Sequence, residues 1–267
     1  MNGRSIWAMI LIAAGVAFLL ENFGILPGNA WDFIWPLVLI ALGLSFLTRR
    51  GRGPSFAIVD DTLPLDGATS ARVTLSHGGG RLVVTAGPRD DRLYAGRFGG
   101  AVARTVRRSG DQLEVTLRPD PRDWTGWRGS WRWGGGEGML DWTIAFNPAV
   151  DLALSLETGA AKTDLDLSSL RVVELLLQTG VSATTVILPA AAGATRATIK
   201  AGVASVHLTI PAGVAARIAG QMGLGAFNVD ETRFPRNGKL YESPDYATAT
   251  NRIDVNVEGG LGAINVG

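Results

Sequence analysis

A glycine recurs at nearly constant intervals through the last part of the chain. Five of these glycines anchor a repeat: Gly159, Gly180, Gly202, Gly223 and Gly260. The first three intervals are 21, 22 and 21 residues, and the last, of 37, holds one ordinary turn and an insertion. A fixed period near 20 residues is typical of a solenoid, in which each turn stacks on the next and buries a shared apolar column. We expect each anchor to supply a positive φ or a tight bend at a corner between two short strands.

The residues around each anchor alternate between apolar and polar. Apolar residues stand five and three before and one and six after nearly every anchor; around Gly180 they are Leu175, Leu177, Val181 and Val186. The residue two before the anchor is polar in every turn: Glu157, Gln178, Lys200, Gln221 and Glu258. Successive side chains of a strand face opposite sides, so the alternation indicates strands. The ladder predicts that four of the apolar side chains point inward: Leu177, Val186, Val203 and Leu208.

A weaker copy of the repeat lies nearer the amino terminus. Taking Gly78 as an anchor puts Leu75 three residues before it, Val73 five before it and Val84 six after it. This segment is therefore interpreted as a degenerate first turn of the same ladder.

The rest of the chain after residue 47 is expected to be strand and loop. Residues 93–98 and 101–118 are predicted strands, the second broken by a hairpin turn, and no strong amphipathic-helix pattern is present. The fold class predicted for residues 61–267 is all-β, a single-stack β-solenoid with turns of about 21 residues. Two insertions interrupt it, near 120–141 and 232–250.

Two apolar runs stand at the amino terminus, at 6–20 and 31–47. A helix needs roughly 20 residues to span a bilayer core, a length that each run reaches only with its flanking residues. A Pro-Gly-Asn turn signal at 27–29 separates the runs. We predict a two-helix transmembrane hairpin over 1–50 and a linker over 51–60. The alternatives are a buried hairpin and a cleaved signal peptide, although no small-residue cleavage site follows the first run.

The charges that flank the two runs predict their orientation. Arg4 precedes the first run and Arg49 and Arg50 follow the second, whereas the connecting loop carries Glu21 and Asp32. Basic flanks stay on the cytoplasmic side, and two spans return the chain to the side where it started. The expected localisation is the cell membrane, with two spans and a large cytoplasmic domain.

Composition argues against several kinds of site. The net charge of +1 gives no case for nucleic-acid binding, and the absence of cysteine excludes disulfides and thiolate metal sites. Two histidines are too few to favour a zinc site. A phosphate-binding loop leads into a helix and a Lys-Ser/Thr pair. The glycine triplets at 78–80 and 134–136 are followed by neither. No cofactor is expected.

Carboxylates offer one route to catalysis, because parallel β-solenoids can carry polysaccharide-cleaving sites. Asp164 and Asp166 share one strand face, and a polar ladder stands five residues after the anchors: Asp164, Thr185, His207, Asn228 and Asn265. Stacked turns lie about 4.8 Å apart, so roughly 10 Å would separate Asp164 from His207, too far for a direct acid–base pair. We interpret the ladder as a solvated outer face and the chain as non-enzymatic.

Residues 120–141 form the one segment without period, and they are rich in tryptophan and arginine. Six of them are candidate membrane or partner contacts: Trp124, Trp127, Arg128, Trp131, Arg132 and Trp133. Tryptophan favours the lipid–water interface, and each arginine near an anionic surface adds roughly 1 kcal/mol of binding. The alternative is a hairpin whose indoles fold back over an open solenoid edge.

The chain also resembles a known family. The turn ENFGILP followed by WDFIWPLVLIALGL is similar to the LiaI/LiaF-like transmembrane region. The segments LETGAAKTDLDLSSLRVVELLLQTGVSATTVILP, IKAGVASVHLTIPAGVAARI and VEGGLGAINV resemble the carboxy-terminal domain of LiaF-like cell-wall-active antibiotic response proteins, and residues 62–87 resemble the related toast-rack domain. The resemblance implies a bacterial membrane protein from a family that includes negative regulators of envelope-stress two-component systems. LiaF proteins are predicted with more than two spans, and the single hairpin departs from that pattern.

Three hypotheses about function follow. The leading one is a non-enzymatic, membrane-anchored interaction or regulatory protein of envelope-stress signalling, whose partners are the membrane and a sensor histidine kinase or another membrane protein. The second is a surface adhesin or glycan-binding solenoid, which requires the domain to lie outside the cell. The third is a solenoid hydrolase or lyase, which requires clustered outward carboxylates. Uniform stacked faces suit protein docking better than they suit a deep substrate pocket.

Overall fold

The computed structural model describes residues 58–120, 140–191 and 193–267, and all the regular elements in them are strands. The strands are β1 (Ile58–Pro64), β2 (Ser70–Ala86), β3 (Arg92–Gly99), β4 (Val102–Ser109), β5 (Gln112–Pro119), β6 (Trp142–Phe146), β7 (Asp151–Asp166), β8 (Arg171–Ile187), β9 (Ala194–Thr209), β10 (Ala215–Val229), β11 (Arg236–Asn237), β12 (Leu240–Glu242) and β13 (Arg252–Val266). No helix within these ranges is long and apolar enough to cross a membrane. The predicted hairpin, 1–50, falls outside the described residues. The first strand begins inside the predicted linker.

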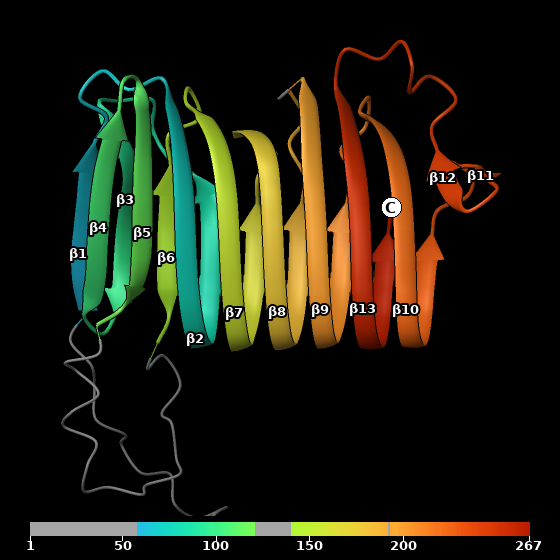
Figure 1. Cartoon of the computed structure of the whole chain (residues 1–267), viewed down its shortest axis with the longest axis horizontal. Coiled ribbons are helices and arrows are strands. Elements are labelled where there is room, and N and C mark those ends of the chain that lie inside the picture. Colours follow the sequence, from blue (N-terminus) through green and yellow to red (C-terminus); the bar gives the residue numbers. More distant parts are fainter. Residues whose placement is uncertain (1–57, 121–139, 192) are drawn as a thin grey trace, which may run out of the picture. The chain divides into compact units, whose positions relative to one another are not determined.

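Six long strands, each of 15 to 17 residues, form the body of the domain: β2, β7, β8, β9, β13 and β10. Each strand descends one wall, bends, and ascends the opposite wall, and its neighbours in the stack do the same (Figure 1). Parallel pairing continues across the bend, as between β7 and β8, where Gly159 and Gly180 stand unpaired between paired positions. One bent strand therefore makes both walls of one turn.

The core lies between the two walls. Every second side chain of a long strand points into it, and this alternation shifts by one residue at the bend. Along β7 the buried side chains are Leu152, Leu154, Leu156 and Thr158 on the first wall, and Ala161, Thr163 and Leu165 on the second. The two consecutive residues Gly159 and Ala160 both face outward. The bend thus moves the inward side chains from even to odd positions, so the residue just after each anchor lies outside.

This shift explains which of the four predictions of an inward side chain are correct. Leu177, Val186 and Leu208 are buried, as predicted. The prediction that Val203 points inward is wrong, because its side chain is 49% exposed on the outside of the bend. The weaker first turn is part of the stack: Val73, Leu75 and Val84 are buried and Gly78 lies opposite Gly159 between two paired positions.

The stack does not follow chain order at its carboxy-terminal end. We expected each turn to stack on the next, but β13 lies between β9 and β10 and pairs with both of them in parallel. The insertion after β10 carries the chain back, so that the last strand closes the gap between the two preceding turns. Gly260 therefore neighbours Gly202 and Gly223.

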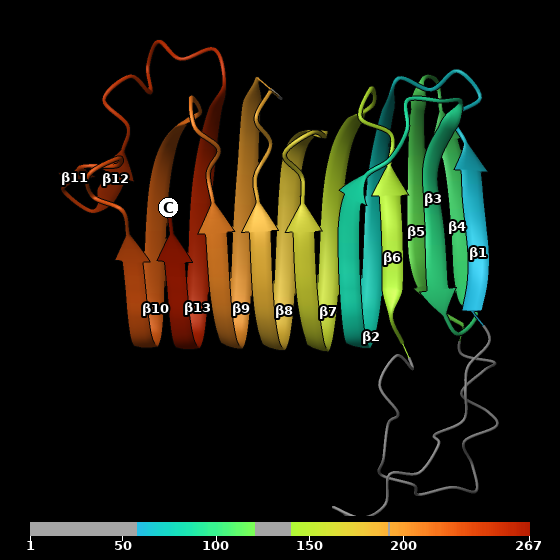
Figure 2. The same ribbon diagram turned by 180° about the vertical axis from the view of Figure 1, so that it is seen from behind.

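Shorter strands close the amino-terminal end of the stack: β5 and β6 pair with β2 in parallel, and the strands beyond them pair antiparallel. The first wall of β2 pairs with β5, which forms a hairpin with β4, and the second wall pairs with β6. Strands β3 and β1 continue from β6 (Figure 2). The predicted hairpin turn is present, since β4 and β5 are joined at Gly110, which has a φ of 62°. Only the six long strands are regular solenoid turns.

The carboxy-terminal end is closed over part of its length. Strand β12 pairs with β10 only at Arg217 and Ile218, and β11 pairs with β12. Beyond Ile218, β10 is paired on one side alone among the residues the structure describes. Phe227 and Tyr241 meet edge to face, with ring centroids 6.1 Å apart, and cover the end of the core.

Candidate functional site

The bends of the six long strands lie side by side and form one surface, which we call the corner surface. Three rows of residues run along it: the glycine row takes one residue from each of the six turns, and the other two rows take one from each of the five turns other than β2. The polar row is Glu157, Gln178, Lys200, Glu258 and Gln221; the glycine row is Gly78, Gly159, Gly180, Gly202, Gly260 and Gly223; and the apex row is Ala160, Val181, Val203, Leu261 and Leu224. Turns in register lie about 4.8 Å apart, so each row repeats at that spacing.

The glycine row exists because the backbones of neighbouring turns approach closely at the bend. A Cβ on Gly180 would lie 2.9 Å from the carbonyl oxygen of Gly159, and one on Gly202 would lie 2.7 Å from that of Gly180. The same clash recurs at every anchor after Gly78, where a Cβ would meet nothing within 4 Å. None of the five predicted anchors has a positive φ, so that part of the expectation is wrong. Close approach between backbones makes glycine necessary here.

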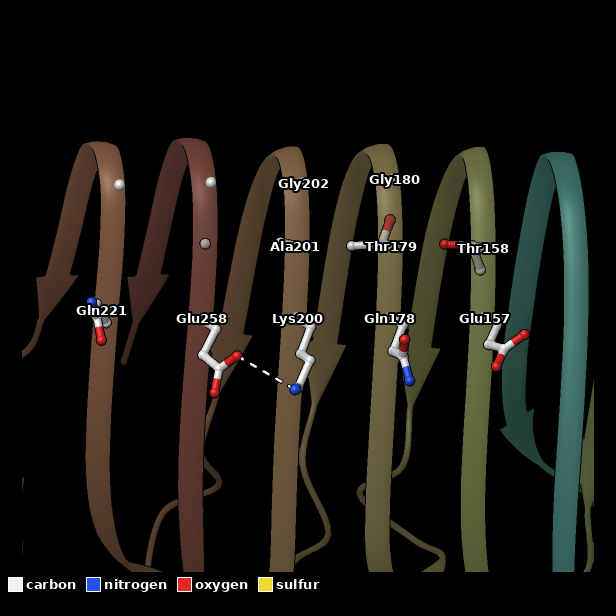
Figure 3. A pocket seen from close by; sticks show the side chains of 13 residues that line it. Glu157, Thr158, Gln178, Thr179, Gly180, Lys200, Ala201, Gly202, Gln221 and Glu258 are labelled. Carbon is white, nitrogen blue, oxygen red and sulfur yellow. Dashed lines mark ion pairs between the residues drawn. The ribbon is translucent and has the colours of Figure 1, made fainter.

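The polar row borders a shallow, open groove that runs beside the glycine row (Figure 3). The side chains of Lys200 and Glu258 form an ion pair at 3.5 Å, and both are about half exposed. An exposed pair of this kind contributes little to stability. Glu157 accepts a long hydrogen bond of 3.4 Å from Ser76. The row mixes charges of both signs with amides, so it offers a partner hydrogen bonds without a strong net field.

The apex row is aliphatic and exposed. The sequence pattern predicted an inward side chain for one of its members, Val203, because a valine just outside the bend looks the same as an inward valine in a pattern of period two. One signal could have separated them. The residues two after each anchor are all small, because they occupy the narrow inside of the bend: Ala161, Ser182, Ala204, Gly262 and Gly225.

The corner surface ends at β2 in a buried histidine. The Nε2 of His77 donates to the carbonyl oxygen of Leu140 at 2.7 Å, and the ring packs at 5.2 Å from that of Trp142. Burial lowers the pKa of His77, and the Leu140 carbonyl and the charge of Asp141 oppose that shift only partly. His77 is therefore held neutral, and its Nδ1 has no hydrogen-bond partner among the described residues.

The polar ladder five residues after the anchors faces outward on the second wall. Arg81 and Asp164 form an ion pair at 2.8 Å, and the side-chain amide of Asn228 donates a hydrogen bond to Oδ1 of Asn265 at 2.9 Å. Asp164 and His207 lie two strands apart, as the spacing predicted. No group of three or more His, Asp or Glu side chains that could hold a metal occurs in the described ranges. The arrangement offers hydrogen bonds and apolar contact to a binding partner.

The six tryptophan and arginine candidates lie outside the described residues. They are Trp124, Trp127, Arg128, Trp131, Arg132 and Trp133. The ends of their segment are described. Strand β5, in register with β2, leads to Asp120 near the level of Gly78, and the carbonyl of Leu140 contacts His77 beside that glycine. Both ends therefore lie at the corner surface.

Two solved structures align with much of the chain. A candidate cell adhesion protein from Clostridium sporogenes aligns with a TM-score of 0.69 and 22% identity, over 79% of this chain and 98% of its own. A candidate adhesin from Bacteroides fragilis aligns over 81% and 100%, with a TM-score of only 0.31 and 11% identity. The first shares the fold, and the second is too distant to support an argument. No curated protein matches the chain.

Two family models match the sequence. The model of the LiaI-LiaF-like transmembrane region matches residues 5–47, and the chain is accordingly membrane-associated. The model of the N-terminal domain of toast_rack, DUF2154, matches residues 55–209, which is more than half of the chain. The stacked, bent strands and the two matches together place this chain in the toast-rack family, as a LiaF-like member.

Proposed function

We propose that this protein is a non-enzymatic, membrane-anchored interaction module that regulates signalling in the bacterial cell-envelope stress response. A two-span hairpin anchors it, and the β domain works on the cytoplasmic side. Family membership supports the anchor, and the basic residues that flank both apolar runs support the orientation. Each face of the stacked turns repeats the same kinds of side chain, which supports docking of a protein rather than turnover of a substrate.

The observation that carries the proposal is the free edge of β10. From 219 to 229 this strand pairs with β13 alone, so one row of its backbone groups has no strand partner among the described residues. Gly223, Gly225 and Ala226 in this stretch have at most a methyl side chain, which leaves the backbone there accessible. A strand edge of this kind can accept a strand from another protein, whose backbone supplies the hydrogen bonds.

The partner proposed for this edge is a sensor histidine kinase or another membrane protein of the same signalling system. Crosslinking in intact membranes, followed by capture of the full chain, tests this directly. Ala226→Lys places a charged side chain on the free edge, which should block strand addition. The matched control is Ala183→Lys, which occupies the same register but lies in β8, inside the stack.

The proposal expects the wild type and the Ala183→Lys variant to capture the same membrane protein, and Ala226→Lys to lose it. Equal capture by both lysine variants would contradict docking at the β10 edge. Recovery of no membrane protein by the wild type would contradict the signalling role.

The alternative is a surface adhesin, because a solved structure that shares the fold is named as a candidate for cell adhesion. At 22% identity this likeness supports the fold and gives no evidence of adhesion here. An adhesin needs its domain outside the cell, so the side of the membrane on which the domain lies separates the two functions.

A further inference from the structure

The apex row is a continuous line of exposed aliphatic side chains. Val181 is 61% exposed, Val203 and Leu261 are 49% exposed, and Leu224 is 71% exposed. These four are half of the eight large hydrophobic residues that are exposed in the described ranges. Adjacent members are register partners, so with Ala160 the line runs for about 19 Å over four inter-strand spacings. Contiguous exposed apolar side chains are a candidate contact surface for a protein or a membrane.

The chain enters the domain at the same edge as the apex row. Ile58 pairs with Gly99, whose N–H donates to the carbonyl of Asp141 at 2.9 Å. The Asp141 carboxylate accepts from the backbone N–H of Arg81 at 3.0 Å, three residues after the bend of β2. Ile58, which is itself 63% exposed, therefore begins β1 at the level of the bends (Figure 1).

The tether that precedes this entry point is short. The transmembrane match ends at residue 47, so ten residues separate it from Ile58. Ten extended residues reach at most about 35 Å. The chain therefore enters the domain at the edge that carries the apex row, and a tether of this length allows that edge to reach the membrane surface.

We propose that the apex row rests in the headgroup–acyl boundary of the bilayer that anchors the chain. This inference rests on the membrane anchor of the proposed function. The row is one residue wide and carries only aliphatic side chains, too narrow for a stable protein interface of about 800 Å² per partner. Lipid is fluid and can surround a narrow ridge. The flanking charges alternate in sign, as at Lys200 and Glu258, so the contact relies on apolar insertion and needs no anionic lipid.

The chain has no cysteine, which allows a single label to report on the environment of the row. We would place Val181→Cys and Val173→Cys in separate full-length proteins, label each with bimane, and reconstitute them in phosphatidylcholine bilayers. Both valines are exposed residues of β8. They are eight residues apart, about 26 Å along the strand, so Val173 is the matched control far from the bend.

The proposal expects a lipid carrying a shallow nitroxide to quench the label at 181 at least threefold more than the label at 173. It also expects aqueous iodide to show the reverse order. Equal quenching at both sites would overturn it. Protection of the label at 181 from both quenchers would overturn it in favour of contact with a second copy or another protein.

A second variant checks that the row itself makes the contact. With the label at Leu224→Cys, replacing Val181, Val203 and Leu261 by serine should abolish quenching by the lipid nitroxide. These side chains are exposed, so the fold should be retained, which thermal unfolding would verify. Quenching that survives the triple change would contradict docking by the row. Capture of a partner at the β10 edge is a separate readout, so failure of either proposal can be recognised alone.

Discussion

The ring of Phe227 occupies the space that a side chain on Gly220 would fill. Gly220 stands three residues before its anchor, where the other turns carry Leu156, Leu177, Ile199 and Val257. Phe227 stands four residues after the anchor, where the neighbouring turns carry the smaller Ile264 and Val206. The large ring on one wall thus fills the space left by the absent side chain on the other wall. This happens in β10, at the end of the stack, where no further turn of the described chain covers the core.

This pair makes a prediction about coupled substitutions. Gly220→Ile should lower the free energy of unfolding by about 1–3 kcal/mol, because the added side chain overlaps the ring. Phe227→Ile should also destabilise, through lost burial. The double variant restores the pattern of the other turns, so it should be more stable than the sum of the single effects by at least about 1 kcal/mol. Urea unfolding of the four proteins measures the coupling, and strict additivity would contradict the pairing.

The glycine row predicts a graded response to alanine. Gly180→Ala puts a methyl group 2.9 Å from the carbonyl oxygen of Gly159 in the preceding turn, so it should force the turns apart and cost about 1–3 kcal/mol. Gly78→Ala is the matched control, because the new methyl group would meet nothing within 4 Å. Its unfolding temperature should stay within a degree or two of the wild type. If the two variants melt at the same temperature, close approach between neighbouring backbones does not explain why the row consists of glycine.

Protonation of His77 predicts that the domain loses stability in acid. Burial lowers the pKa of His77 in the folded state, so the unfolded chain takes up this proton first as the pH falls below about 6.5. Stability from this group is therefore present above pH 6.5 and is lost as the pH falls from there toward the lowered folded-state pKa. The slope for one proton is at most about 1.4 kcal/mol per pH unit.

Two histidine variants test this assignment. His77→Thr gives β2 the residue that Thr158 and Thr179 supply in the next two turns, and it should flatten the pH dependence between pH 5 and 7.5. His207→Thr is the control, because it removes the other histidine, which lies exposed on the outer face of β9. Urea unfolding at several pH values provides the measurement. An unchanged slope in His77→Thr would assign the acid sensitivity to other groups.

The segment rich in tryptophan and arginine remains a prediction. If it docks on an anionic surface, residues 54–267 should bind anionic vesicles in a salt-dependent way. Replacing Trp127, Trp131 and Trp133 by alanine should then abolish binding without changing the melting temperature. If the segment covers a strand edge, the same variant should melt lower and the wild type should not bind. A stable variant that binds as the wild type does would leave the segment with neither role.

Much of the fold could be predicted because the residues before and after each glycine alternate between apolar and polar on both walls. Leu177 and Gln178 alternate between core and solvent, so their sides follow from a period of two. The order of the turns could not be predicted. Gly260 and its neighbours match the pattern of all the other turns. The strand that carries them would therefore fit any position in the stack, and its sequence does not indicate which one it takes. That choice depends on the path of the insertion after β10.

The surfaces proposed for binding were harder to predict than the core. Val181 and Val203 look like core residues in the sequence, and only the shift at the bend places them outside. The free edge of β10 also has no sequence signal of its own, because its exposure results from β13 entering the stack on the other side. Gly220 was visible as the one exception in its column, but its cause lies seven residues away, on the opposite wall.

The side of the membrane on which the domain lies is the most direct test of the account. Basic residues flank both predicted spans, so residues 54–267 should be cytoplasmic, where they could reach the signalling domains of a kinase. Alkaline phosphatase and a fluorescent protein, each fused after Gly267, report the location in living cells. The account predicts an inactive phosphatase and a bright fluorescent protein. An active phosphatase with a dark fluorescent protein would contradict it and would favour the adhesin.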